Sequence, residues 1–109
     1  MSYDIRRTLV FEKKLKILGK KYASIKNDYA ALLDALQVHP TQGAPLGQGC
    51  YKVRMAIASK NKGKSGGARV ITLVKVEAKR IILLDIYDKS DQGTITEKEL
   101  TELLKALPE

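Results

Sequence analysis

The feature that most constrains the fold is a pair of apolar segments joined by a short connection in the second half of the chain. The segments "ARVITLVKVE" (68–77) and "RIILLDIY" (80–87) are apolar at nearly every position. Apolar runs of this length, rich in β-branched residues, predict strands that lie centrally in a sheet and are buried on both faces. Because the connection at "AKR" (78–80) is short, the two strands are predicted to pair antiparallel.

The segments around this pair predict an α+β fold. Alternating or β-branched segments predict strands, and apolar residues recurring at three- and four-residue spacing predict helices. In chain order the predicted elements are a strand at 5–11, helices within 11–18 and 25–36, a loop at 39–49, a half-buried strand at 50–58, the apolar pair, and a leucine-rich helix at 100–107. This order predicts a single domain over residues 1–109, an antiparallel four-stranded sheet with its helices, two N-terminal and one C-terminal, on one face.

The charge of the chain is uneven along its length. The 109 residues carry a formal net charge of +8. Residues 1–84 hold 17 basic and 5 acidic residues, whereas residues 85–109 hold 3 basic and 7 acidic residues. A basic body favours a polyanionic partner, with nucleic acid first and an acidic protein second, although a basic surface can also serve solubility alone.

The sequence favours a soluble cytoplasmic protein with no membrane segment. No apolar run is long enough to span a bilayer, and the N-terminus becomes charged within four residues instead of forming a signal-peptide core. Cys50 is the only cysteine, so no internal disulfide can form.

A cationic cluster follows Cys50. It consists of Lys52, Arg54, Lys60, Lys62, Lys64 and Arg69, with no acid among them. Lys52 and Arg54 stand two apart on one predicted strand and therefore point to the same face. Lys60, Lys62 and Lys64 lie on the basic loop 59–67 and are predicted to bind RNA.

Tyr87 and Lys89 extend this cluster, because they stand two apart at the end of the third predicted strand. If the strands are neighbours, one sheet face gathers them with Lys52, Arg54 and Arg69. Cations beside a phenol suit a phosphodiester. RNA can be cleaved without a metal when its own 2′-OH attacks the adjacent phosphate, which needs a base, positive charge and an acid.

These residues offer candidates for each chemical role. Neighbouring cations favour the neutral form of a lysine, so Lys52 can serve as the base. Arginines can hold the phosphate with two donors, and Tyr87 can orient the nucleophile or stack on a base. The single histidine, His39, lies at a predicted helix end, so histidine-based cleavage is not favoured. The alternative is a polar sheet face that carries Lys and Arg only for solvation.

The segment from Asp88 to Glu99 resembles a calcium-binding loop in the spacing of its acids and of Gly93. Such a loop needs a helix on each side, but the segment entering this one is a predicted strand. Thr96 and Glu99 instead fit a helix capping box that precedes the leucine stripe. The sequence therefore predicts a turn and a capped helix, with no calcium and no other metal.

Three blocks resemble the RelE/ParE superfamily of bacterial toxins, and most closely its RelE/HigB-type members. They are "FEKKLKILGKKYASIKNDY", "GCYKVRMAIASKNKGKSGGARVI" and "LLDIYDKSDQGTITEKELTELLKAL", and they cover nearly the whole chain. The resemblance implies a microbial-RNase-like RelE fold and a toxin that cuts mRNA in the ribosomal A site without a metal or other cofactor. It also implies a cognate antitoxin that neutralises the toxin.

The resemblance also implies site residues. "YKVR" gives Lys52 and Arg54 as base and phosphate contacts, "GGARV" gives Arg69 as the transition-state arginine, and "IYDKS" gives Tyr87 and Lys89 for stacking, acid or phosphate roles. Lys89 stands where an arginine is often found, which makes it a poorer bidentate donor. Two alternatives stay open: a ParE-like toxin that inhibits DNA gyrase by protein contact, and an inactive relative that binds RNA or antitoxin.

Overall fold

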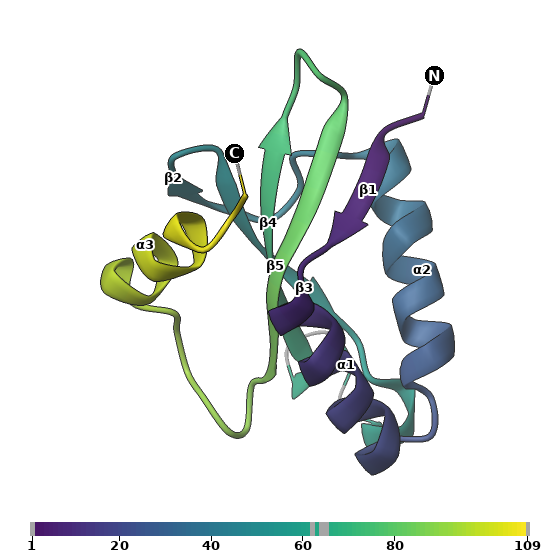
Figure 1. Cartoon of the computed structure of the whole chain (residues 1–109). Helices are drawn as coiled ribbons and strands as arrows, with labels where there is room; N and C mark the ends of the chain where they lie inside the picture. Colours follow the sequence, from purple (N-terminus) through teal and green to yellow (C-terminus); the bar gives the residue numbers. More distant parts are fainter. Residues whose placement is uncertain (1, 62, 64–65, 109) are drawn as a thin grey trace.

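The computed structural model describes residues 2–61, 63 and 66–108. In this part of the chain, five strands form one sheet that is flanked by three α-helices and a short 3-10 helix (Figure 1). The elements are β1 (Asp4–Arg7), α1 (Leu9–Lys21), α2 (Ile25–Val38), β2 (Ala44–Gly47), β3 (Cys50–Met55), η1 (Ala58–Lys60), β4 (Ala68–Lys75), β5 (Arg80–Asp88) and α3 (Glu97–Lys105). The strand order is β1-β5-β4-β3-β2.

The two apolar segments form the antiparallel pair β4–β5 inside the sheet, which confirms the prediction. The pairing runs from Ala68 opposite Asp88 to Lys75 opposite Arg80. Every residue of β4 except Lys75 is buried, as expected of a strand covered on both faces. Lys79 makes the turn between the strands with a left-handed φ of 50°.

The sheet has five strands where four were predicted, and it is mixed instead of antiparallel throughout. β1 pairs parallel with β5, with Asp4 opposite Arg80. β2 forms in the segment predicted as a loop and pairs antiparallel with β3 at the sheet edge. The loop prediction is wrong there because the strand is short and contains Pro45 and Gly47, which are typical of loops. A proline cannot donate to a strand ladder, so it is tolerated only at such an edge.

β1 is shorter than the predicted strand because Thr8 starts α1. The Thr8 hydroxyl accepts a hydrogen bond from the Phe11 N–H at 3.1 Å and donates to the Leu83 carbonyl at 3.2 Å. The first contact caps the helix, and the second fastens this helix start to β5.

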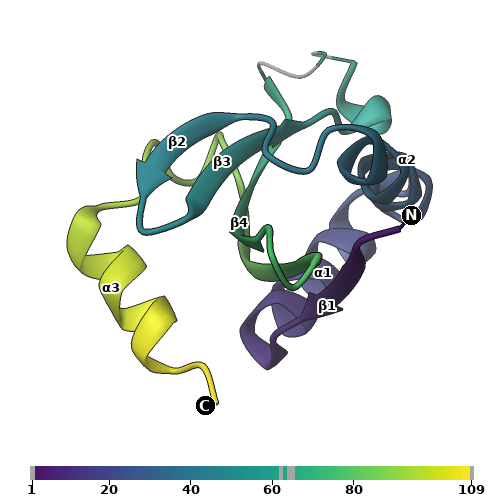
Figure 2. The same ribbon diagram turned by 90° about the horizontal axis from the view of Figure 1, so that it is seen from above.

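The helices cover both faces of the sheet, whereas the prediction placed them on one face. α1 and α2 pack on one face through apolar residues that include Phe11 and Leu36. α3 lies on the opposite side of the sheet (Figure 2), where Leu100 and the preceding Ile95 pack with β-strand residues such as Ile71. None of the helices in the described ranges is long and apolar enough to cross a membrane.

Candidate functional site

Charged and phenolic side chains form a row across three neighbouring strands. Arg54 on β3 pairs with Arg69 on β4, and Arg69 pairs with Tyr87 on β5. Directly paired residues point to the same face, and Lys52 shares that face because it stands two residues before Arg54. Of the five side chains predicted to share one face, the strand register places these four there, whereas the fifth, Lys89, lies beyond the end of β5. We call Lys52, Arg54, Arg69 and Tyr87 the cross-strand row; it lies on the face that α3 covers.

The members of the cross-strand row on β3 are more exposed than its members on β4 and β5. The Arg54 side chain is exposed and Lys52 is partly buried, whereas Arg69 is 3% and Tyr87 6% exposed. A ligand in solution therefore meets the β3 end of the row first. The β5 end lies beneath α3 and the segment that leads into it.

Arg69 is held in the middle of the row. Its Nη1 donates to the Ala68 carbonyl at 3.2 Å. Burial and the nearby Arg54 both lower the pKa of the Arg69 guanidinium, while Tyr87 opposes this shift. An arginine still keeps its charge at neutral pH, so two like charges face each other here. A phosphate between Arg54 and Arg69 would relieve their repulsion and accept several hydrogen bonds.

Tyr87 is a protonated phenol with a buried hydroxyl. Burial raises the pKa of Tyr87, and the nearby main chain of Ile95 and the charge of Arg69 only partly oppose the increase. Ile95 lies close to the phenol, yet within the described part of the chain the hydroxyl has no hydrogen bond of ordinary geometry. An anion that reached Tyr87 would therefore meet an available proton donor.

An acidic residue beside the row was missed by the sequence analysis. Asp85 pairs with Ile71, which in turn pairs with Lys52, and its carboxylate forms an ion pair with Lys14 of α1 at 2.7 Å. The Asp85 side chain is 7% exposed, and its charge contributes to the raised pKa of Tyr87. No local pattern identifies this contact, because 71 positions separate the two partners.

Lys89 lies one position beyond the end of β5, so strand alternation no longer fixes the direction of its side chain. Its backbone N–H donates to the Gly67 carbonyl at 3.0 Å, and the residue is exposed. The structure thus places Lys89 near the row without pairing it with any member of the row. Its catalytic role stays a prediction.

The three loop lysines have different outcomes. The ammonium of Lys60 forms an ion pair with Asp88 at 2.8 Å, and the Lys60 side chain is only 9% exposed. Its predicted RNA contact stays a prediction, because the structure already gives the ammonium a protein partner. Lys62 and Lys64 lie outside the described residues.

The calcium-like segment forms the predicted helix cap. It is entered by a strand, β5. The Thr96 hydroxyl accepts from the Glu99 N–H at 3.1 Å, and the Glu99 carboxylate accepts from the Thr96 N–H at 2.9 Å, which confirms the capping box. The carboxylates of Asp88 and Glu99, the first and twelfth positions of the loop pattern, thus both accept hydrogen bonds from the protein.

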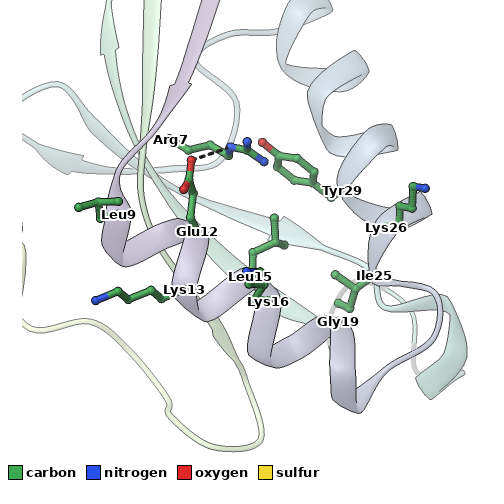
Figure 3. A pocket seen from close by; sticks show the side chains of 10 residues that line it. All are labelled: Arg7, Leu9, Glu12, Lys13, Leu15, Lys16, Gly19, Ile25, Lys26 and Tyr29. Carbon is green, nitrogen blue, oxygen red and sulfur yellow. Dashed lines mark ion pairs between the residues drawn. The ribbon is translucent and has the colours of Figure 1, made fainter.

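Two hollows differ in chemistry. One, of about 440 Å³, lies beside the exposed end of the cross-strand row and is lined in part by Lys52 and Arg54. The other, of about 460 Å³, lies between α1 and α2 (Figure 3). It has apolar residues such as Leu15 and Tyr29 along it, and an ion pair between Arg7 and Glu12 at 3.5 Å borders it. Only the first hollow combines access with the cations of the row.

Comparisons with known proteins agree with this fold. A family model described as the RelE toxin of the RelE/RelB toxin–antitoxin system matches residues 10–107. The chain is similar to the free-state structure of a double mutant of the E. coli toxin RelE, with a TM-score of 0.64 and 14% identity over 99% of this chain and 100% of that chain. It is also similar to a chain of the RelBE2 toxin–antitoxin complex from Mycobacterium tuberculosis, with a TM-score of 0.56 and 13% identity over 84% of this chain and 95% of that chain.

Proposed function

Because the chain belongs to the RelE toxin family, we propose that this toxin is a metal-independent endoribonuclease that cuts mRNA on the ribosome. The observation that carries the proposal is the cross-strand row, in which Arg54, Arg69 and Tyr87 stand side by side on three strands. With Lys52 on the same face, the row supplies the groups that RNA cleavage by internal attack needs.

In the proposed reaction, Lys52 acts as the general base and takes the proton of the ribose 2′-OH. The 2′-oxygen then bonds to phosphorus, and Arg54 and Arg69 stabilise the negative charge that builds on the phosphate oxygens. The bond from phosphorus to the 5′-oxygen breaks, and Tyr87 gives its proton to that leaving oxygen. The products are a 2′,3′-cyclic phosphate and a free 5′-OH.

Access to the row has two steps in this proposal. The RNA first meets Arg54, which is exposed, and the neighbouring Lys52, which is partly buried. Contact with Tyr87 then requires Ile95 and Leu100 to shift, since these residues belong to the apolar cluster in which Tyr87 is buried. Lys62, Lys64 and Lys89 add further positive charge for binding RNA.

We further propose that the toxin works in the cytoplasm, where mRNA is translated, and that a cognate antitoxin protein neutralises it. The family description and the matched complex support the antitoxin, since both concern toxin–antitoxin pairs. The strongly basic body, with a sequence pI of about 9.6, favours an antitoxin segment that carries carboxylates.

The test is to express the chain without its antitoxin and to map the 5′ ends of cellular mRNA. Cuts within translated frames, ending in a 5′-OH and absent when translation is blocked, are expected. Intact mRNA with a DNA-damage response would instead support gyrase inhibition, which needs no phosphate-binding row. Normal growth with intact mRNA and intact DNA would support an inactive relative.

A further inference from the structure

Asp88 carries a buried carboxylate that accepts hydrogen bonds from three residues and also lies 4.0 Å from the Lys21 ammonium. Its side chain is 0% exposed. One oxygen accepts from the Lys60 ammonium at 2.8 Å and from the Ser90 N–H and hydroxyl at 2.9 and 2.6 Å. The other accepts from the Tyr22 hydroxyl at 2.6 Å. Burial alone would raise the pKa of Asp88, but the hydrogen bonds from Lys60, Ser90 and Tyr22 outweigh it and hold the pKa below its ordinary value.

This carboxylate joins segments that are far apart in sequence. Tyr22 follows the end of α1, Lys60 ends η1, and Asp88 ends β5. η1 is itself attached to the start of α2, because Ser59 donates its N–H to the Ser24 hydroxyl at 2.9 Å. Asp88 therefore connects the end of β5 to the end of α1 and, through η1, to the start of α2.

Both ends of the basic loop (59–67) are held by contacts with the end of β5, at Asp88 and Lys89. Lys60, at the start of the loop, is held by the Asp88 carboxylate. At its other end, Ala68 pairs with Asp88 in the β4–β5 ladder, and Gly67 accepts the Lys89 N–H at 3.0 Å. Gly67 lies so close to β3 that a Cβ at this position would be 2.2 Å from the Met55 carbonyl oxygen.

Asp88 also lies between two predicted site residues. Successive side chains of a strand point to opposite faces, so Tyr87 faces the cross-strand row while Asp88 faces the helices. The contacts that hold Asp88 on the helix face therefore also fix the direction of the Tyr87 side chain on the opposite face. The same contacts set the start of β4, where Arg69 follows Ala68.

We propose that Asp88 is a positioning residue: its ion pair with Lys60 holds the end of β5 and both ends of the basic loop, so that Tyr87 and Arg69 face the RNA in one fixed arrangement. The proposal rests on the proposed endoribonuclease function. Lys60 then acts through Asp88 and does not touch RNA. Loss of this placement slows the chemical step, because a displacement of about 1 Å can reduce a rate by roughly a hundredfold.

The first test is Asp88→Asn, which keeps the shape of the side chain but removes its charge and replaces one of its two accepting oxygens by an NH2 donor. The single-turnover rate of mRNA cleavage, measured on programmed ribosomes with saturating toxin, should fall at least about tenfold. The affinity for the ribosome should change less than twofold or so, because no phosphate contact is lost. A folded Asp88→Asn toxin that cleaves at the wild-type rate would overturn the proposal.

The second test separates position from stability. Asp88→Asn leaves the Lys60 ammonium buried without its counter-ion, which lowers the melting temperature. Adding Lys60→Met removes that ammonium, so the double variant should recover much of the melting temperature while cleavage stays slow. If stability and rate recover together, Asp88 has only a structural role. Should Asp88→Asn fail to fold, the double variant carries the same comparison.

Two controls complete the design. Ile81→Val, at the other end of β5, lowers stability through the core and should leave the cleavage rate near wild type. Lys60→Met alone should leave the salt dependence of ribosome binding unchanged, whereas a lost phosphate contact would reduce the log–log slope by about 0.7. A reduced slope would show that Lys60 binds RNA and would overturn the assigned role.

A readout without RNA distinguishes failure of this proposal from failure of the proposed function. In NMR spectra of the free toxin, the Arg69 side-chain Nε–H signal and the Tyr87 ring signals should shift in Asp88→Asn, while the Nε–H signal of Arg80 stays in place. Unchanged Arg69 and Tyr87 signals would refute the positioning role. If these signals shift in Asp88→Asn but the wild-type toxin cuts no mRNA, the positioning role of Asp88 is retained and the proposed endoribonuclease function is rejected.

Discussion

Replacing Arg69 by methionine tests the central step of the proposed reaction. Methionine fills much of the space of the arginine stem but carries no charge. Arg69 is 3% exposed, and burial together with Arg54 lowers the pKa of its guanidinium. The charged form is therefore costly in the folded protein, so Arg69→Met should fold with a melting temperature within a few degrees of wild type.

The expected loss of activity is large because the charge is needed mainly in the transition state. Removing a single donor to a developing oxyanion lowers a rate by on the order of 10²–10³, or roughly 2.7–4 kcal/mol. Arg69 can offer two donors to the phosphate, so the loss should reach at least the lower end of this range. Ribosome binding should change much less, because in the proposed reaction the exposed Arg54 and the partly buried Lys52 make the first contact.

The assay is single-turnover cleavage of mRNA on purified ribosomes, with growth arrest in cells as a second readout. Arg80→Met is the matched control, because it makes the same change on β5 at the far end of the sheet, where Arg80 lies 3.6 Å from Asp4. It should cut at the normal rate. Full cutting by a folded Arg69→Met toxin would remove Arg69 from the site and refute the reasoning from burial and charge.

Three further predictions concern stability and binding. Thr96→Ala should lower the free energy of unfolding by about 1 kcal/mol through loss of the capping box, measured by urea denaturation, while Thr94→Ala, at an exposed position without that contact, should have little effect. The pKa of Asp88 is lowered in the folded state. Its contribution to stability is therefore complete above the ordinary aspartate pKa of about 4 and is lost as the pH falls below that value. Asp88→Asn should flatten this part of the acid denaturation curve. The antitoxin complex should weaken from low to high salt, measured by calorimetry, and an affinity independent of salt would contradict a carboxylate-rich partner.

The central part of the fold could be predicted because its information is local. The pair β4–β5 follows from two apolar runs and a short connection, and the capping box follows from four consecutive residues. The pairing of β1 with β5 could not be predicted, since it joins Asp4 to Arg80 and no pattern in either segment encodes the other. The leucines of α3 predict a buried side of the helix, but they do not indicate which face of the sheet it covers.

The candidate site shows the same division. Strand periodicity correctly placed Lys52, Arg54, Arg69 and Tyr87 on one face, because alternation is a property of each strand and the register follows from neighbouring strands. Lys60 was assigned to RNA on its charge alone. Its partner Asp88 lies 28 positions away, and a long-range ion pair leaves no mark in either local sequence.

The least predictable property of the site is its burial, which has a mechanistic consequence. Periodicity tells which face a side chain occupies, but the exposure of that face depends on what packs over it. Here Leu100 and Ile95 cover Tyr87, while Arg54 at the other end of the row stays exposed. In the proposed reaction, binding through Arg54 and chemistry through Tyr87 therefore take place at opposite ends of one row. In the proposed reaction, movement of α3 separates them, so a variant that loosens α3 should alter the cleavage rate more than the first contact with RNA.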